Sequence, residues 1–173
     1  MTSKTTLPSN GLPAIKRLIS DVNKDGKAVF LESINEDLKF EDLVLIPFGS
    51  DVSARSVVAY ATNSFPTTLR DQTDIKVYEE YTQNPPGVSI PNGTVLRYLD
   101  FPPGARSPMH KTKSLDYGIV LEGTIVASLD SGEERVMHRG DVLVQRGTEH
   151  DWRNGSDTEW ARMVYVLLDS HPN

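Results

Sequence analysis

Two histidines at matching positions in two similar segments are the residues best suited to do chemistry in this chain. His110 lies in the stretch from Gly104 to Gly123, and His150 lies in the stretch from Gly140 to Asn154. The chain has only four histidines, so a matched pair points to a shared role. Imidazole binds metal ions and transfers protons near neutral pH.

The first chemistry open to the pair is metal binding. With the carboxylate of Asp116, His110 and His150 would form a two-histidine, one-carboxylate site that leaves coordination positions open. Such sites suit Fe(II), and mixed nitrogen and oxygen ligands also hold Mn, Zn or Ni. A divalent metal is therefore a candidate cofactor.

The second chemistry needs no metal. A histidine oriented by a carboxylate serves as a general acid or base and typically contributes roughly 10²–10⁴-fold to a rate. His110 or His150 would remove a proton, the other histidine or Tyr117 would return one, and Asp116 would supply the carboxylate. This chemistry suits isomerisation, dehydration, cyclisation or decarboxylation of an acidic carbonyl compound.

Several residues near the histidines are candidates to bind a substrate. Alternate residues of a strand face the same side, so Thr112 should follow the direction of His110, and Trp152 that of His150. An inward-facing arginine could hold a substrate carboxylate or enolate, and strand parity leaves open which of Arg97, Arg153 and Arg162 does so. The candidate substrate-binding residues are Arg97, Thr112, Trp152, Asn154 and Tyr165.

The elements that must position these residues are short strands. From residue 95 onward, runs rich in Val, Leu, Ile and Tyr alternate with glycine turns, a pattern typical of an antiparallel sandwich or barrel. The predicted strands are Val95–Phe101, Asp116–Glu122, Thr124–Leu129, Glu134–Met137, Asp141–Gln145 and Trp160–Leu168. The fold class predicted is therefore all-β.

The N-terminal part of the chain is predicted to pack onto the same domain. Two β-prone runs, Ile15–Ile19 and Ala28–Leu31, flank an Asp-Gly turn and predict a hairpin. Residues 1–12 are polar and predict a flexible or subunit-swapped arm, whereas residues 13–173 form one domain. Further predictions are strands at Leu43–Phe48 and Ser56–Thr62, one helical turn at Asn35–Phe40, a loop at Phe65–Asp74, and no long amphipathic helix.

The spacing of these residues resembles the two sequence motifs of the cupin β-barrel family. The first motif is G-x5-H-x-H-x3-E-x6-G and the second is G-x5-P-x-G-x2-H-x3-N. The matching residues are Gly104, His110, Gly123, Gly140, Gly147, His150 and Asn154. Two of the four metal-ligand positions differ, because Thr112 replaces a histidine and Asp116 replaces a glutamate. The resemblance implies a jelly-roll-like antiparallel barrel at about residues 94–169, with the hairpin as an N-terminal extension.

The same resemblance implies a small-molecule enzyme. Related cupins occur in biosynthetic pathways for natural products, which implies an enzyme of secondary metabolism of the lyase or isomerase type. Two alternatives remain open. One is a metal-dependent dioxygenase or decarboxylase, and the other is a non-catalytic barrel that binds a small ligand, which the altered metal-ligand set favours.

Composition narrows the choice of partner. The net charge is −6 and no run of five like charges occurs, which argues against nucleic acid and anionic membranes as partners. The absence of cysteine excludes disulfides and thiolate metal sites. No apolar stretch approaches the ~20 residues of a membrane span, so a cytoplasmic protein is expected. Open strand edges predict a homodimer.

Overall fold

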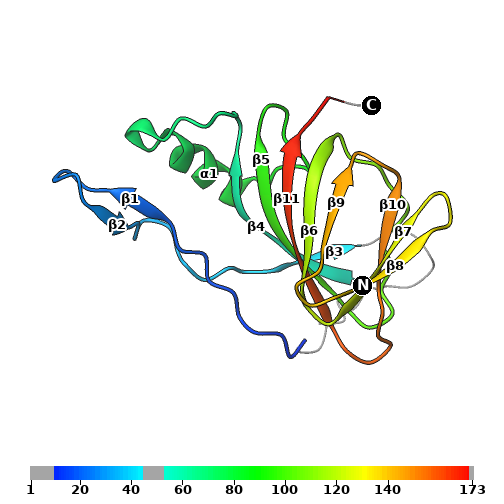
Figure 1. Cartoon of the computed structure of the whole chain (residues 1–173). Coiled ribbons are helices and arrows are strands. Elements are labelled where there is room, and N and C mark those ends of the chain that lie inside the picture. Colours follow the sequence, from blue (N-terminus) through cyan, green and yellow to red (C-terminus); the bar gives the residue numbers. More distant parts are fainter. Residues whose placement is uncertain (1–9, 45–52, 172–173) are drawn as a thin grey trace, which may run out of the picture.

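The computed structural model describes residues 10–44 and 53–171, which form two facing β-sheets, a β-hairpin and one α-helix (Figure 1). All strand pairs in the described part are antiparallel. The all-β antiparallel fold predicted from the sequence is confirmed. Within the described ranges, no helix is both long and apolar enough to cross a membrane.

The larger sheet has six strands in the order β3-β4-β5-β11-β6-β9. Their bounds are β3 Glu41–Val44, β4 Ser53–Thr62, β5 Thr94–Phe101, β6 Ser114–Glu122, β9 Val142–Arg146 and β11 Ala161–Asp169. The last strand of the chain, β11, lies in the middle, between β5 and β6. It is buried on both faces from Ala161 to Tyr165, which explains its nearly continuous apolar sequence rather than an alternating one.

The smaller sheet has three strands in the order β10-β7-β8. Their bounds are β7 Thr124–Leu129, β8 Glu134–His138 and β10 His150–Asn154. The segment before β6 runs beside β10 through two isolated bridges, Arg106 to Arg153 and His110 to His150. This extra pairing fastens the first histidine segment to the second.

The hydrophobic core lies between the two sheets. Phe101, Val120 and Met163 from the larger sheet and Ile125 from the smaller one are fully buried. Burial of each large apolar side chain stabilises the fold by about 1.5–3 kcal/mol. The core therefore ties β5, β6, β7 and β11 into one unit.

The predicted N-terminal hairpin is confirmed, with its strands shifted. It consists of β1 Ser20–Val22 and β2 Ala28–Phe30, joined through a turn in which Gly26 has a φ of 76°. Figure 1 shows the hairpin standing away from the two facing sheets. Of the predicted arm, residues 1–9 lie outside the described residues, and Asn10 donates a hydrogen bond to Asp100 of the same chain at 2.7 Å.

The helix is the main departure from the sequence predictions. A short 3-10 helix, η1 Arg70–Gln72, leads into α1 Thr73–Gln83, where the sequence predicted a loop at Phe65–Asp74 and no long helix. Only Ile75 and Tyr78 of α1 are buried, so its apolar face is too narrow to stand out in the sequence.

Two smaller predictions also differ. No helical turn occurs at Asn35–Phe40, because Asp37 pairs with Lys16 in an isolated antiparallel bridge that holds this segment extended. The strand predicted at Leu43–Phe48 is β3 as far as Val44, and its remaining residues lie outside the described part of the chain.

Candidate functional site

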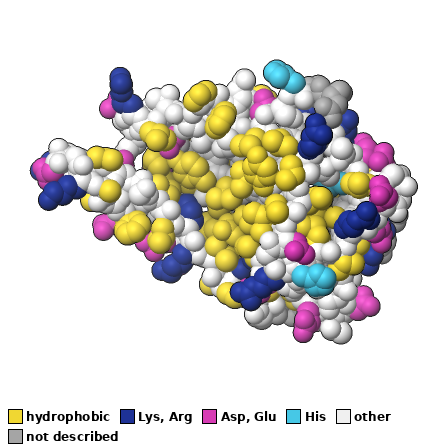
Figure 2. All heavy atoms as spheres, viewed as in Figure 1, with side chains coloured by type: hydrophobic (Ala, Val, Ile, Leu, Met, Phe, Trp, Pro, Cys, Tyr) yellow, Lys and Arg dark blue, Asp and Glu magenta, His cyan; other side chains and the backbone are white. Residues whose placement is uncertain are grey.

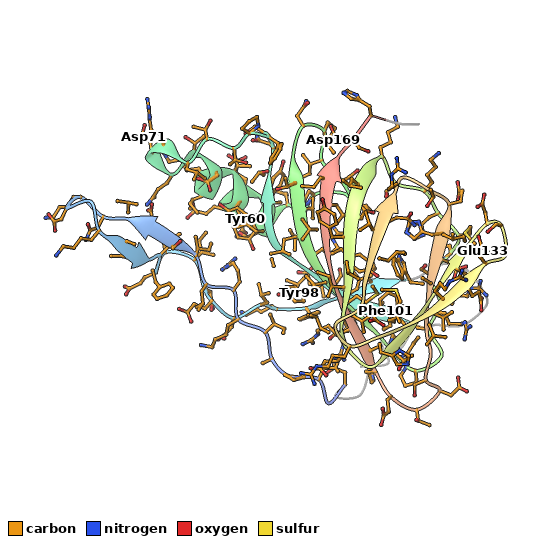
Figure 3. The ribbon with its side chains drawn as sticks, in the orientation of Figure 1. Tyr60, Asp71, Tyr98, Phe101, Glu133 and Asp169 are labelled. Carbon is orange, nitrogen blue, oxygen red and sulfur yellow. The ribbon has the colours of Figure 1, made fainter. Side chains whose placement is uncertain are left out.

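A cavity of about 200 Å³ lies between the two sheets and contains most of the predicted site residues. Its polar lining residues are Arg97, Ser107, His110, Thr112, Asp116 and His150. Its apolar and aromatic lining residues are Leu43, Val88, Leu99, Phe101, Pro108, Trp152, Tyr165 and Leu167. Figure 3 labels Phe101 near the region where the two sheets face each other, and Tyr98 on the side nearer the N-terminal arm.

The backbone brings the two histidines face to face. The amide of each residue donates to the carbonyl of the other, at 2.9 Å in both directions, so His110 and His150 are directly opposite partners. Side chains of such partners leave the same face of a sheet. The two imidazole centroids are accordingly 4.3 Å apart.

Both rings are held by the same kind of hydrogen bond. Nδ1 of His110 lies 2.8 Å from the carbonyl oxygen of Pro108, and Nδ1 of His150 lies 2.9 Å from that of Thr148. A carbonyl oxygen only accepts, so each Nδ1 carries the proton. In the neutral rings Nε2 is therefore the unprotonated nitrogen, available as a base or a ligand.

Burial keeps His150 neutral. Its side chain is in the protein interior, with a residue exposure of 3%, and this burial is the main cause that lowers its pKa from 6.5 to about 4. The hydrogen bond to Thr148 acts in the opposite direction, whereas the nearby His110 lowers the pKa further. At neutral pH the ring is an acceptor rather than a cation.

Asp116 lies in the same cavity with one oxygen unpartnered. Its Oδ2 accepts a hydrogen bond from the Thr112 hydroxyl at 3.2 Å, and that hydroxyl accepts one from Ser114 at 2.9 Å. Oδ1 is buried without a hydrogen-bond partner among the described residues. Burial is the main cause that raises the pKa of Asp116, while Ser114 and Thr112 lower it.

These residues do not fit a metal centre with three protein ligands. Among residues 10–44 and 53–171, no group of three or more His, Cys, Asp or Glu side chains is arranged to hold a metal ion. The predicted set of His110, His150 and Asp116 therefore does not converge on one point. Thr112 occupies the position of the expected second histidine, and its hydroxyl binds one oxygen of Asp116 instead.

An aromatic wall continues from the histidines across the cavity. Trp152 stands edge-on to His150 and to Tyr165, with centroids 5.5 Å apart in both pairs. Gly118 makes room for this wall, because a Cβ at that position would lie 3.2 Å from Tyr165 and 3.3 Å from Trp152. Burial raises the pKa of the Tyr165 hydroxyl well above 10, so this group stays protonated.

Two predicted site residues, Tyr117 and Asn154, lie outside the cavity. Tyr117 is 37% exposed on the opposite side of β6 from Asp116, because successive residues of a strand face opposite ways. The structure therefore does not bring Tyr117 together with the other predicted site residues. Asn154 is structural, since its side-chain amide donates to the carbonyls of Phe101, Pro102 and Glu159.

Of the three candidate arginines, the structure places only Arg97 at the cavity. Arg162 is buried elsewhere in an ion pair with Asp100, and Arg153 is partly exposed beside Glu134.

The cavity also includes residues that the sequence analysis missed. Leu99, Phe101 and Leu167 follow the inward alternation of Arg97 and Tyr165 on β5 and β11, so strand parity could have identified them. Val88 comes from the loop between α1 and β5, where no periodic pattern operates. The remaining missed residues are Leu43, Ser107 and Pro108.

Comparison with known proteins agrees with this fold. A model of the cupin domain matches residues 97–167. The chain is 39% identical to the cupin-domain-containing oxidoreductase virC of Hypocrea virens, over 97% of this chain and 82% of virC. The chain belongs to the cupin family. This cupin is also 47% identical to phomopsin biosynthesis cluster protein C' of Diaporthe leptostromiformis, over 90% of this chain and 79% of that protein.

Two solved structures are also similar to this chain. An oxalate oxidase is 28% identical over 46% of this cupin and 44% of that chain, with a TM-score of 0.40. A putative ethanolamine utilization protein from Salmonella typhimurium is 15% identical over 92% of this chain and all of its own, with a TM-score of 0.48.

Proposed function

We propose that this cupin is a small-molecule enzyme of specialised metabolism that moves a proton within its substrate, in a reaction of the lyase or isomerase type. The observation that carries the proposal is the pair of imidazoles 4.3 Å apart in a largely apolar cavity. The biosynthesis-cluster names of relatives such as phomopsin cluster protein C' support specialised metabolism as the setting.

The cavity residues divide the work of an acid and a base. His150 is neutral at physiological pH, so its Nε2 can accept a proton from the substrate. A base with a pKa of about 4 is weak, and it is matched to an acidic proton, such as one next to a carbonyl group. The proton is then returned to another atom of the substrate through the facing ring of His110. Alternatively, the protonated form of Asp116, whose pKa is raised by burial, donates a proton and is reprotonated from His150.

Exchange of hydrogen with solvent tests this function. Candidate carbonyl metabolites are incubated with the protein in D₂O, and deuterium incorporation is followed by mass spectrometry. We expect incorporation with the native chain and its loss in the double variant His110→Ala/His150→Ala. The matched control is His138→Ala, because His138 ends β8 and has an exposed side chain. Full exchange in the double variant would reject the proposal.

A second candidate is a barrel that binds a ligand without turnover. It is favoured by the cavity's lack of a three-ligand metal set among the described residues, which leaves a largely apolar pocket with a few polar groups that suits binding alone. Ligands that raise the melting temperature without incorporation of deuterium or formation of product would favour this candidate.

The names of several relatives make an oxidation reaction a third candidate function. Four of them, virC included, are named cupin-domain-containing oxidoreductases. Elemental analysis of protein purified without chelator, together with oxygen consumption after addition of Fe(II), Mn(II), Ni(II) or Zn(II), distinguishes this candidate from proton transfer. Oxygen consumption that depends on a metal would favour oxidation.

We further propose that two copies of this cupin form a cytoplasmic homodimer. The hairpin exposes Val22 and Phe30, which are 64% and 66% accessible, and an isolated two-stranded hairpin is only marginally stable in water. Figure 2 shows apolar side chains gathered in the middle of the same view, over the larger sheet, where Val142 and Val144 of β9 are exposed. A second copy would cover both surfaces.

A further inference from the structure

We infer that the substrate of the proposed reaction is a monocarboxylate, whose apolar body fills the cavity and whose carboxylate is bound by Arg97. This inference rests on the proposed function and names its substrate class. It follows from four features of Arg97 and its surroundings. These are its position, its hydrogen-bond partners, the volume of the cavity beside it and the acidic side chain of Asp116 in the same cavity.

Arg97 lies at the boundary between two hollows. Its side chain borders the inner cavity that contains the histidines, and it also borders an outer groove of about 750 Å³. This groove lies between β4, α1 and the extended segment at residues 33–41. A ligand in the groove therefore lies next to Arg97, whereas the imidazoles line only the inner cavity.

The partners of Arg97 leave its charge without a counter-ion. Nη2 donates to the carbonyls of Pro86 and Gly87 at 3.3 and 3.0 Å, and Nε has no hydrogen-bond partner among the described residues. Both partners are neutral, and no carboxylate of the described chain lies within ion-pair distance. Burial lowers the pKa of the guanidinium, as expected for a cation in a poorly solvated place.

Two other arginines of this protein have a structural role, and each is paired with a carboxylate. Arg162 forms a two-point pair with Asp100 at 2.6 and 2.7 Å, and Arg106 forms one with Asp151 at 2.9 and 2.6 Å. A planar guanidinium matches a carboxylate in this geometry. Arg97 has the same group beside a cavity and no such partner, so a carboxylate on the ligand completes the pattern.

The inner cavity sets the size of the ligand's body. An apolar cavity of about 150 Å³ is enough to hold benzene, so the 200 Å³ cavity accepts one ring with a small substituent. Arg97 and Tyr165 are directly opposite residues on β5 and β11, and Tyr165 stacks edge-on against Trp152. The carboxylate site therefore adjoins an aromatic surface that suits a flat ring.

Asp116 limits the ligand to one carboxylate. Its side chain lines the inner cavity with Oδ1 unpartnered. In the ionised form it would repel a second anionic group placed there, and in the protonated form it offers no positive charge to hold one. A dicarboxylate of the same size is therefore disfavoured. The single negative charge belongs at Arg97, on the groove side of the cavity.

The test compares each acid with its own amide. Binding of benzoate, benzamide, 3-phenylpropanoate and 3-phenylpropanamide to the full chain is measured by calorimetry. Because a hydrogen bond to a charged group is worth more than one to a neutral group, we expect at least one acid to bind about tenfold or more tightly than its amide. Equal affinity within both pairs, absence of measurable binding included, would overturn the inference.

Variants then assign the preference to one residue. We expect Arg97→Gln to abolish the preference for acid over amide, Arg97→Lys to retain part of it because the charge remains, and Arg153→Gln, at a partly exposed arginine beside Glu134, to leave it unchanged. A preference that survives in Arg97→Gln overturns the inference. If Arg97→Gln does not fold, Arg97→Lys and the native chain are compared at high salt. A preference for acid over amide that is equally strong in both overturns the inference.

The outcome is separate from that of the proposed function. The double variant His110→Ala/His150→Ala should keep the acid preference, because Arg97 is intact, while it loses deuterium exchange. Exchange without any acid preference would refute the monocarboxylate and leave the proton transfer standing. A preference for the acid without deuterium exchange would refute the proton transfer and leave the monocarboxylate standing.

Discussion

The two-sheet core buries large apolar side chains, whereas the N-terminal hairpin exposes them. Phe101 on β5 is fully buried, whereas Phe30 on β2 is 66% exposed. The core covers its apolar surface with the facing sheet, so it can also hold the neutral His150 and an unpartnered carboxylate oxygen of Asp116 in place. The hairpin has no such cover in one chain. The site is therefore a property of the core, and the hairpin is the part available to a partner.

Truncation of the two phenylalanines should give the largest contrast. We expect Phe101→Ala to lower the free energy of unfolding by about 3–5 kcal/mol, because a buried ring is lost and a cavity remains. Phe30→Ala should stay within about 0.5 kcal/mol in the monomer. Urea unfolding at low protein concentration measures both, and equal losses would contradict the division into core and exposed hairpin.

The second largest expected effect is the change in the free energy of unfolding with pH. Because folding lowers the pKa of His150 from 6.5 to about 4, the unfolded chain binds more protons between these values. Stability from this residue is complete above pH 6.5 and falls as the pH drops toward 4, by roughly 3 kcal/mol at most. The raised pKa of Asp116 acts with the opposite sign and offsets part of the loss.

His150→Gln isolates that contribution. The variant should show a flatter decrease in the free energy of unfolding between pH 6.5 and 4 than the native chain, measured by urea unfolding at several pH values. A slope unchanged by the substitution would mean that His150 is not buried in its neutral form.

A single methyl group added beside the aromatic wall of Trp152 and Tyr165 should lower the free energy of unfolding. Gly118→Ala places a Cβ 3.2–3.3 Å from Tyr165 and Trp152, and overpacking of this kind typically costs about 1–3 kcal/mol. Gly87→Ala is the control, since its Cβ would meet only Ser89 at 3.8 Å. Tryptophan fluorescence and urea unfolding report the change, and identical behaviour of the two variants would argue against a tightly packed wall.

The smallest effect on chain stability should come from a charge on the hairpin. Phe30→Glu is expected to leave the monomer's unfolding unchanged and to convert a dimer to a monomer, because it places a charge on the surface proposed to be covered. Light scattering at micromolar concentration measures this, with Phe65→Glu as the control at another exposed phenylalanine. A native chain that is already monomeric would refute the dimer.

The sequence predicted the core better than its surroundings because strand patterns are local. The runs from Val95 to Leu168 alternate or stay apolar as their positions in two packed sheets require, and the pairing of His110 with His150 followed from matching motifs. Helix α1 was missed because only Ile75 and Tyr78 mark its buried face. Tyr117 lies outside the cavity because it directly follows Asp116, and neighbours on a strand face opposite sides.

The most direct test of the paired imidazoles is a nitrogen NMR titration of the protein labelled at histidine. We predict that His150, identified by its loss in His150→Gln, stays neutral with the proton on Nδ1 until the pH approaches 4, and that its signals shift when His110 is replaced by Gln. A His150 ring that titrates near 6.5 in the folded protein, or that ignores the substitution of His110, would contradict the buried pair on which the proposed chemistry depends.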